Sequence, residues 1–178
     1  MFDKIKHILK RWINEQDALA GVEAALIFPM MLVLFVGVFD AGNAILANQK
    51  AVRASQVVAD LIARQNIVSS SDLTEAIRAG ELAFEPLNTD SYGVDIVSIR
   101  FDEDADSEIV WRTTQNMTPV PDPLGAVTAL EEANEGVIMV SVVYEFNPMF
   151  SALAIGDIEM REVAFSRGRS ASVVTQAP

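Results

Sequence analysis

The feature that most constrains this 178-residue chain is an apolar run close to its start. Residues 18–39 read ALAGVEAALIFPMMLVLFVGVF, and Glu23 is the only charged residue among them. About 20 apolar residues are needed for a helix to cross the hydrocarbon core of a bilayer. The run therefore predicts one membrane-spanning helix over residues 18–39.

A secretory signal peptide is the main alternative, because a basic segment precedes the apolar run. However, the run is longer than the apolar stretch of a usual signal peptide. Its C-terminal end also has no small-residue cleavage site followed by a polar mature chain. The sequence passes instead through Asp40, Ala41 and Gly42 into more helix-forming residues. We therefore expect the segment to be retained as a membrane anchor.

The direction of the span follows from the basic residues at its two ends. Four of them lie among the first 11 residues, whereas only Lys50 and Arg53 follow soon after the span. Positive charge favours the cytoplasmic side. We therefore expect residues 1–17 to form a basic cytoplasmic segment and residues 40–178 to form a domain on the far side. In a bacterium with two membranes, this places the anchor in the inner membrane and the domain in the periplasm.

Charge and composition exclude several classes of function. Residues 1–39 carry four basic and four acidic side chains, so the net charge of −12 belongs entirely to residues 40–178. Such an acidic domain repels nucleic acid. The chain has no cysteine, and its one histidine, His7, is expected across the bilayer from the domain's serines. The sequence therefore predicts a non-enzymatic protein with no cofactor.

The residues after the span predict that its helix continues into the domain. Residues 44–65 contain no Gly or Pro, and Ile45, Val52 and Ala59 recur at intervals of seven. Helical periodicity of this kind predicts one helix from the membrane to about residue 66, with residues 40–66 as its extension. Half of the helix is expected in lipid and half against its own domain.

The remaining residues predict a small antiparallel sheet beside this helix. Asp72 and Glu75 have the spacing of a capping box, which opens a short helix ending near Phe84. A second short helix is expected over residues 124–134. The predicted strands are residues 94–101, 109–111, 136–146 and 158–165, rich in β-branched and aromatic side chains. The fold class is therefore α+β.

Five residues of the long helix are candidates for contacts with other chains. Glu23 is a carboxylate in or near hydrocarbon, which is costly unless it finds a partner; alternatively it stays hydrated at the headgroup level. Pro29 removes one helical hydrogen bond and is expected to kink the span. Gly37, Ala41 and Ala44 predict a small-residue face that another helix could approach closely.

An acidic turn between two predicted strands is a weak candidate for a metal site. Asp102, Asp104 and Asp106 alternate as calcium ligands can. However, Ser107 stands where a calcium-binding loop needs Gly, and Thr113 where it needs Glu. We therefore expect a solvated hairpin turn and assign no metal.

Four short segments, taken in order, resemble one known family. In the first, Glu23 and Pro29 keep the family's interval; in the last, Tyr144 begins a Tyr-x-aromatic-x-Pro strand end. The segments are residues 21–29, residues 40–42, the acidic turn before Trp111, and residues 142–148. Together with the long helix they resemble the TadE/TadG-like family of the tight-adherence (Tad/Flp) type IV pilus system.

The resemblance implies a pilin-like fold and a minor pseudopilin or membrane-anchored assembly subunit that supports pilus formation and surface attachment. The implied partners are the inner membrane, other pilus subunits and assembly-platform proteins, in a hetero-oligomer. Prepilins of this system are cut so that the Glu becomes the fifth residue, which would place the cut between Ala18 and Leu19. Ala18 stands where Gly is usual, so processing and retention of the full chain both stay open.

A second function of a different class is also compatible with the residues. The domain could be a membrane-anchored periplasmic binding or sensing module, in which the acidic hairpin binds a cation or a basic partner.

Overall fold

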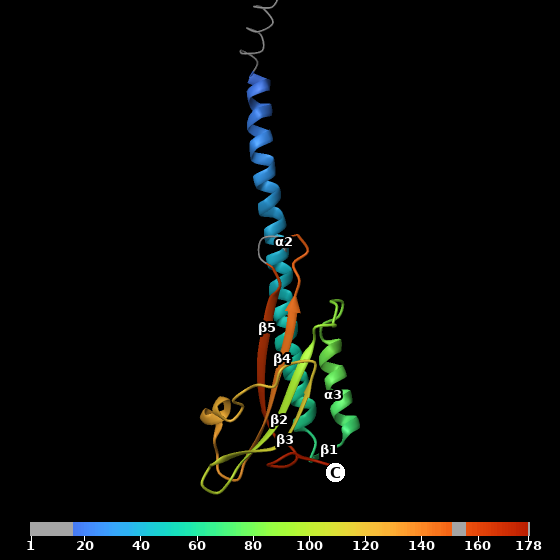
Figure 1. Cartoon of the computed structure of the whole chain (residues 1–178), viewed down its shortest axis with the longest axis vertical. Helices are drawn as coiled ribbons and strands as arrows, with labels where there is room; N and C mark the ends of the chain where they lie inside the picture. Colours follow the sequence, from blue (N-terminus) through green and yellow to red (C-terminus); the bar gives the residue numbers. More distant parts are fainter. Residues whose placement is uncertain (1–15, 151–155, 178) are drawn as a thin grey trace, which may run out of the picture.

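The computed structural model describes residues 16–150 and 156–177, so most of the predicted cytoplasmic segment lies outside the described residues. The longest element of the structure is a single helix, α2 (Gln16–Ala63), which runs along the domain and beyond it (Figure 1). At 1.5 Å per residue its 48 residues extend about 70 Å. It ends three residues before the predicted boundary. Only its second half packs against the domain; the first half extends beyond it.

The buried face of α2 is made mainly of alanine. Ala47, Ala51, Ala54, Val58 and Ile62 are at most 1% exposed and follow one another at intervals of three or four. Small side chains allow the helix axis to lie close to the sheet, while the spacing keeps one continuous stripe buried.

The predicted seven-residue repeat does not stay on this buried face. Ile45 is 61% exposed, Val52 is half-buried and Ala59 is buried. A straight helix turns by about 20° for every seven residues relative to a fixed direction. This drift is only about 40° from Ile45 to Ala59, and Ala59 is buried because α3 packs against the C-terminal part of α2.

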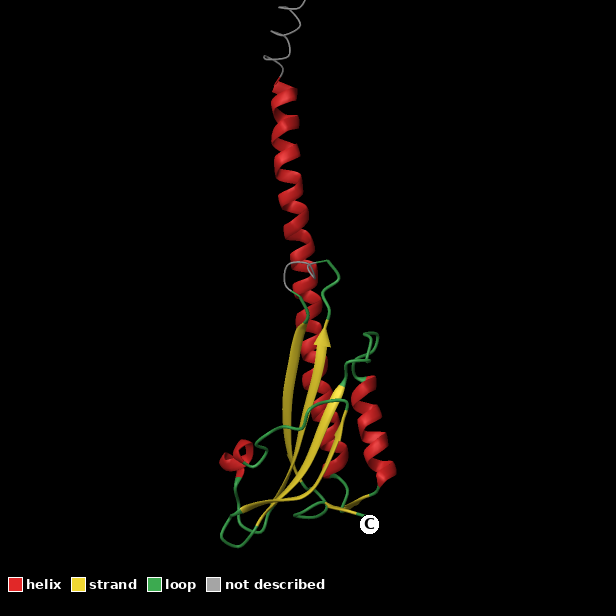
Figure 2. Ribbon diagram, viewed as in Figure 1, coloured by secondary structure: helices red, strands yellow, loops and turns green. Residues whose placement is uncertain are grey.

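Four antiparallel strands form the sheet, as predicted (Figure 2). They are β2 (Gly93–Phe101), β3 (Ser107–Gln115), β4 (Gly136–Phe146) and β5 (Ile158–Arg167). Their spatial order is β3-β2-β4-β5. β4 is the central strand that the sequence indicated most strongly, and its bounds agree with the predicted ones. Alternate residues of each strand face α2 or the opposite side, which sets up two cores.

The two faces of the sheet are covered by different parts of the chain. On one face, Ile96, Val140 and Val142 pack with the alanine stripe of α2. On the other, Val97 and Met139 pack with Val127 of η1 (Gly125–Leu130). The helix predicted over residues 124–134 is thus a shorter 3-10 helix. It follows Pro119, Pro121 and Pro123, which exclude regular structure before it.

The second helix, α3 (Ser70–Leu82), begins earlier than predicted. Its capping box is formed by Ser69 and Asp72, not by Asp72 and Glu75. The Ser69 side chain accepts from the Asp72 amide at 3.3 Å, and Asp72 Oδ2 accepts from the Ser69 amide at 2.8 Å. Both pairs have the same i, i+3 spacing, so the serine run 69–71 left the register ambiguous.

A short parallel pairing near the C-terminus was not predicted. β1 (Ile67–Val68) pairs with β6 (Thr175–Gln176). Trp111 Nε1 and Ser98 Oγ both donate to the carbonyl of Val174 at 2.8 Å. This end of the chain is therefore fixed to the end of α2 and to the sheet. Two-residue strands leave no periodicity in the sequence from which to predict them.

Gly80 allows α3 to lie against α2, and its replacement tests this packing. A Cβ at Gly80 would meet the Tyr92 hydroxyl and lie 2.6 Å from Val58 Cγ2. We expect Gly80→Ala to lower the free energy of unfolding, because overpacking costs about 1–3 kcal/mol and the better helix propensity of Ala returns about 1 kcal/mol.

Chemical unfolding of the full-length protein in detergent measures this change. The matched control is Gly42→Ala in α2, where an added Cβ has no atom within 4 Å and no loss is expected. Equal stability of the two variants would contradict the close packing at Gly80.

Candidate functional site

The first half of α2 is an apolar surface that the described parts of the chain leave bare. Phe35, Val38 and Met30 are 74%, 72% and 71% exposed, and the other large side chains from Val22 to Phe39 are at least 46% exposed, except that of half-buried Val36. This is the one helix among the described residues that is long and apolar enough to cross a membrane, with a mean hydropathy of 2.4 in its most apolar window. An exposed apolar surface of this extent marks a membrane or protein contact.

Glu23 and Pro29 both lie on this bare half of the helix. The Glu23 side chain is exposed, with apolar neighbours above and below it along α2. Pro29 lies inside α2 and does not end the helix. The proposed cut between Ala18 and Leu19 falls within the first turns of α2. The kink at Pro29 and the partner of Glu23 stay predictions.

The predicted small-residue face is divided by the fold. Ala44 packs at the margin of the core between α2 and the sheet, so it serves the domain itself. Ala41 is exposed, and Gly37 is half-buried with no atom within 4 Å of where a Cβ would lie. Only Gly37 and Ala41 of the three are therefore open to a neighbouring helix.

Asp40 marks the point at which α2 leaves the domain. Its side chain is only 3% exposed. Oδ1 accepts from the amide of Met149 at 3.2 Å, and Oδ2 accepts from the amide of Phe150 at 3.0 Å. The ring of Phe39 meets that of Phe150 edge-on, with 5.8 Å between the ring centroids. A buried carboxylate needs such donors, so Asp40 fixes the loop that follows β4 to the helix.

The sequence did not predict this role for Asp40, although it placed the residue at the end of the apolar run. Glu23 and Asp40 are 17 residues apart, or about 26 Å along a helix. The hydrocarbon core of a bilayer is about 30 Å thick. The position of Asp40 at that interval from Glu23 was the one signal in the sequence that pointed to a role for it. The backbone amides that it binds are more than 100 residues away and could not be predicted.

Lys50 is the first basic residue after the apolar run, and it joins α2 to the loop after α3. Its Nζ donates to the carbonyl of Glu85 at 2.5 Å and to that of Ala83 at 3.4 Å. Together, Asp40 and Lys50 attach α2 to two separate loops of the domain. The angle between the bare half of the helix and the domain is therefore held by polar contacts as well as by the alanine stripe.

The acidic turn between β2 and β3 is held by its own first residue. Asp102 Oδ1 accepts from the amides of Asp104 and Asp106, both at 2.9 Å, and Ala105 takes a positive φ of 66°. Among the described residues, no three His, Asp or Glu side chains are grouped so that they could hold a metal ion. The turn therefore presents charge to solvent and does not gather the three aspartates into a metal site.

A buried ion pair on the other face of the sheet was also not predicted. Asp95 is fully buried and accepts from Arg112 Nε at 2.9 Å, Thr114 Oγ1 at 2.7 Å and the Val120 amide at 2.9 Å. Burial raises the pKa of Asp95, but the hydrogen bonds outweigh it and hold the pKa below its usual value. This network fixes the proline-rich segment to the sheet.

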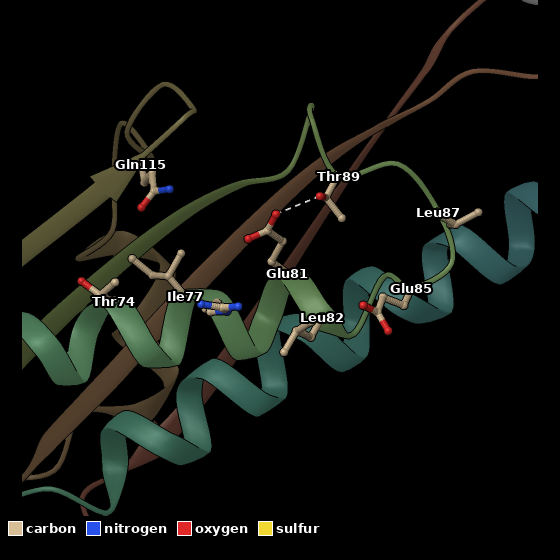
Figure 3. A pocket seen from close by; sticks show the side chains of 9 residues that line it. Thr74, Ile77, Glu81, Leu82, Glu85, Leu87, Thr89 and Gln115 are labelled. Atoms are coloured by element: carbon tan, nitrogen blue, oxygen red, sulfur yellow. Dashed lines mark hydrogen bonds between the residues drawn. The ribbon is translucent and has the colours of Figure 1, made fainter.

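A hollow with a volume of about 510 Å³ lies between α3 and the loop that follows it. Figure 3 shows that Glu81 points across it to Thr89, whose hydroxyl donates to Glu81 Oε1 at 2.8 Å. The lining residues are Thr74, Ile77, Arg78, Glu81, Leu82, Glu85, Leu87, Thr89 and Gln115. The hollow contains none of the candidate residues on α2 or in the acidic turn.

Comparison with known families concerns the long helix. The family model described as TadE-like protein matches residues 20–60. Over residues 20–60, which form most of α2, the chain is similar to TadE-like proteins. The match spans both halves of the helix, from the bare apolar surface with Glu23 and Pro29 through Asp40 and the alanine stripe. No curated protein and no solved structure matches the chain.

The TadE-like match confirms the resemblance that the residues around Glu23 and Asp40 indicated, and it links the chain to the Tad pilus system. Together with the bare apolar half of α2, it supports membrane anchoring of the protein.

Replacing Asp40 tests its role in holding the loop. Asparagine keeps one acceptor oxygen but turns an amide donor toward the second backbone N–H. We expect Asp40→Asn to speed hydrogen exchange at the amides of Met149 and Phe150. We also expect it to lower stability by about 1–3 kcal/mol, the cost of an unsatisfied buried group.

Hydrogen exchange followed by mass spectrometry on the full-length protein in detergent measures this effect. The control is Asp122→Asn, since exposed Asp122 also accepts from a backbone amide, that of Gly125 at 2.9 Å. The control should leave the loop after β4 unchanged. Unaltered exchange in Asp40→Asn would show that Asp40 does not hold the loop.

Proposed function

We propose that this protein is a non-catalytic, membrane-anchored subunit of a tight-adherence type IV pilus. It would act as a minor pseudopilin or as an assembly subunit that supports pilus formation and surface attachment. One observation carries this proposal: a single uninterrupted helix is bare and apolar in its first half, packed on its own sheet in its second, and TadE-like across both.

The structure of α2 suits a subunit that exchanges lipid for protein neighbours. Its bare half needs an apolar environment, which either a bilayer or a bundle of similar helices provides. Its packed half is stabilised by the alanine stripe, Asp40 and Lys50 independently of that environment. The domain would therefore keep its fold if the subunit moved from the membrane into a filament.

The proposed topology has residues 1–17 in the cytoplasm, residues 18–39 in the inner membrane and residues 40–178 in the periplasm. The unequal numbers of basic residues before and after the span support this direction. The proposed partners are other pilus subunits and assembly-platform proteins, in a hetero-oligomer. Gly37 and Ala41 are the open small residues through which a neighbouring helix would approach.

Glu23 is the proposed register contact between subunits. An exposed carboxylate on an apolar helix is stabilised by a positive partner. If the chain is cut between Ala18 and Leu19, the new amino group of a neighbouring subunit is such a partner. If the chain stays intact, Glu23 lies at the inner boundary of the span and contacts headgroups or another helix.

Deletion of the protein tests the proposed function. We expect surface pili to be lost or shortened and attachment to fall, while the cellular amount of the major pilin is unchanged. Electron microscopy, an attachment assay and an immunoblot measure the three quantities. Complementation with Glu23→Gln should restore pili poorly. Glu103→Gln, in the exposed acidic turn, should restore them fully. Normal piliation in the deletion strain would refute the proposal.

The intact mass of the protein from its native membrane separates the two forms of the proposal. A chain that begins at Leu19 would be a processed pseudopilin with an amino group available to Glu23. A chain that begins at Met1 would be a permanent membrane-bound assembly subunit. We expect one of these two masses; a chain that begins after residue 39 would mean that the anchor is removed and would contradict both.

A further inference from the structure

The loop that follows β4 presents two large apolar side chains to the surroundings. Met149 is 73% exposed and Phe150 is 54% exposed. On α2, Phe39 is 46% exposed and its ring contacts that of Phe150. We call the side chains of Phe39, Met149 and Phe150 the junction patch.

The junction patch is continuous with the bare apolar half of α2. Phe39 is the last residue of the apolar run, and its ring contacts that of Phe150. The two amide bonds to Asp40 hold Met149 and Phe150 beside the helix at this level. Figure 1 shows the loop after β4 at the end of the domain from which the bare half of α2 extends.

The charges along α2 define the depth of this patch in a bilayer. Between Glu23 and Lys50 the sequence holds one charged residue, Asp40, and the fold buries it. The 27 residues from Glu23 to Lys50 rise about 40 Å. A bilayer is about 40–45 Å thick with its headgroup layers and has a core of about 30 Å. With Glu23 at one boundary of the core, Asp40 lies near the other and Lys50 at the outer surface.

The strands confirm this limit from the domain side. No charged residue occurs from Phe146 to Gly156. Exposed charge resumes at Asp157, directly after this stretch, and on the strands at Glu145 and Glu159, which pair with each other in register across β4 and β5. The apolar end of the domain therefore stops where its polar surface begins.

We propose that the junction patch is a second membrane contact, in which Met149 and Phe150 insert into the headgroup layer of the bilayer that holds α2. The partner is lipid and not another subunit, because insertion of α2 alone brings the patch to this depth. Asp40, whose charge would oppose insertion, has its oxygens turned onto the loop's own amides. This inference rests on the membrane anchor of the proposed function and not on the pilus assignment.

Two membrane contacts restrict the domain more than one does. A domain held only by a helix can tilt about the point where the helix leaves the bilayer. Insertion of the loop beside α2 adds a second fixed point on one side of the helix. The long axis of the domain is then held at a defined angle, and the same face of the sheet is presented by every copy.

Spin labels in the full-length protein test this contact. The natural sequence has no cysteine, so single cysteines can be introduced without removing any. Met149→Cys carries a nitroxide in nanodiscs of phosphatidylcholine and phosphatidylglycerol, one protein per disc. The controls are Val38→Cys, 72% exposed on the span, and Ile67→Cys, 59% exposed just beyond the far end of α2. Accessibility to oxygen, which prefers lipid, is compared with accessibility to a water-soluble nickel chelate.

We expect the ratio of oxygen to nickel accessibility at position 149 to be several-fold above that at position 67 and to approach that at position 38. If position 149 matches position 67 while position 38 reports lipid, the second contact is wrong and the anchor stands. A label at position 149 that is shielded from both reagents would mean that protein covers the patch, which also overturns the proposal. If position 38 reports water, the anchor and the proposed function fail together.

Discussion

The whole structure depends on one helix that must satisfy two different surroundings at once. The second half of α2 buries an alanine stripe against the sheet, and the stripe begins just after the point where the apolar run ends. Because Ala47, Ala51 and Ala54 are small, β4 and β5 lie close to the helix axis. The domain therefore depends on α2 for its core. Because α2 is one continuous helix, a movement or tilt of its bare half is transmitted to the sheet.

Buried carboxylates fix two irregular segments of the chain to α2 and to the sheet. Asp40 accepts from the loop after β4, and Asp95 accepts from Arg112, Thr114 and the amide of Val120. Both carboxylates accept hydrogen bonds from loop amides, which have no partner in a strand or helix. The two sites lie on different elements, so the β4–β5 loop and the proline-rich segment are each held independently.

With these loops fixed, the two ends of the domain differ in surface chemistry in a way that suits the proposed role. The end nearest the bare helix is apolar, with Met149 and Phe150 beside Phe39, whereas the acidic turn of residues 102–106 lies on the domain away from it. An anchored subunit needs that asymmetry. One end must be compatible with lipid or with neighbouring helices, and the other must stay hydrated and presented outward.

Sequence periodicity and composition determined the elements but not how they meet. The apolar run, the strand over residues 136–146 and the acidic hairpin follow from local chemistry, so the α+β fold and the continuous helix could be predicted. The buried face of α2 could not, because the repeat through Ile45 and Val52 does not mark it, and only contact with the sheet selects the alanines. The roles of Asp40 and Asp95 could not be predicted from the sequence either. Their partners are far away in sequence or are backbone amides, which have no residue signature. Sequence alone thus determined that this chain has an anchor and a sheet. The tertiary structure decided which face of the helix is buried and which carboxylates hold the loops, because those depend on long-range contacts between residues that no local pattern connects.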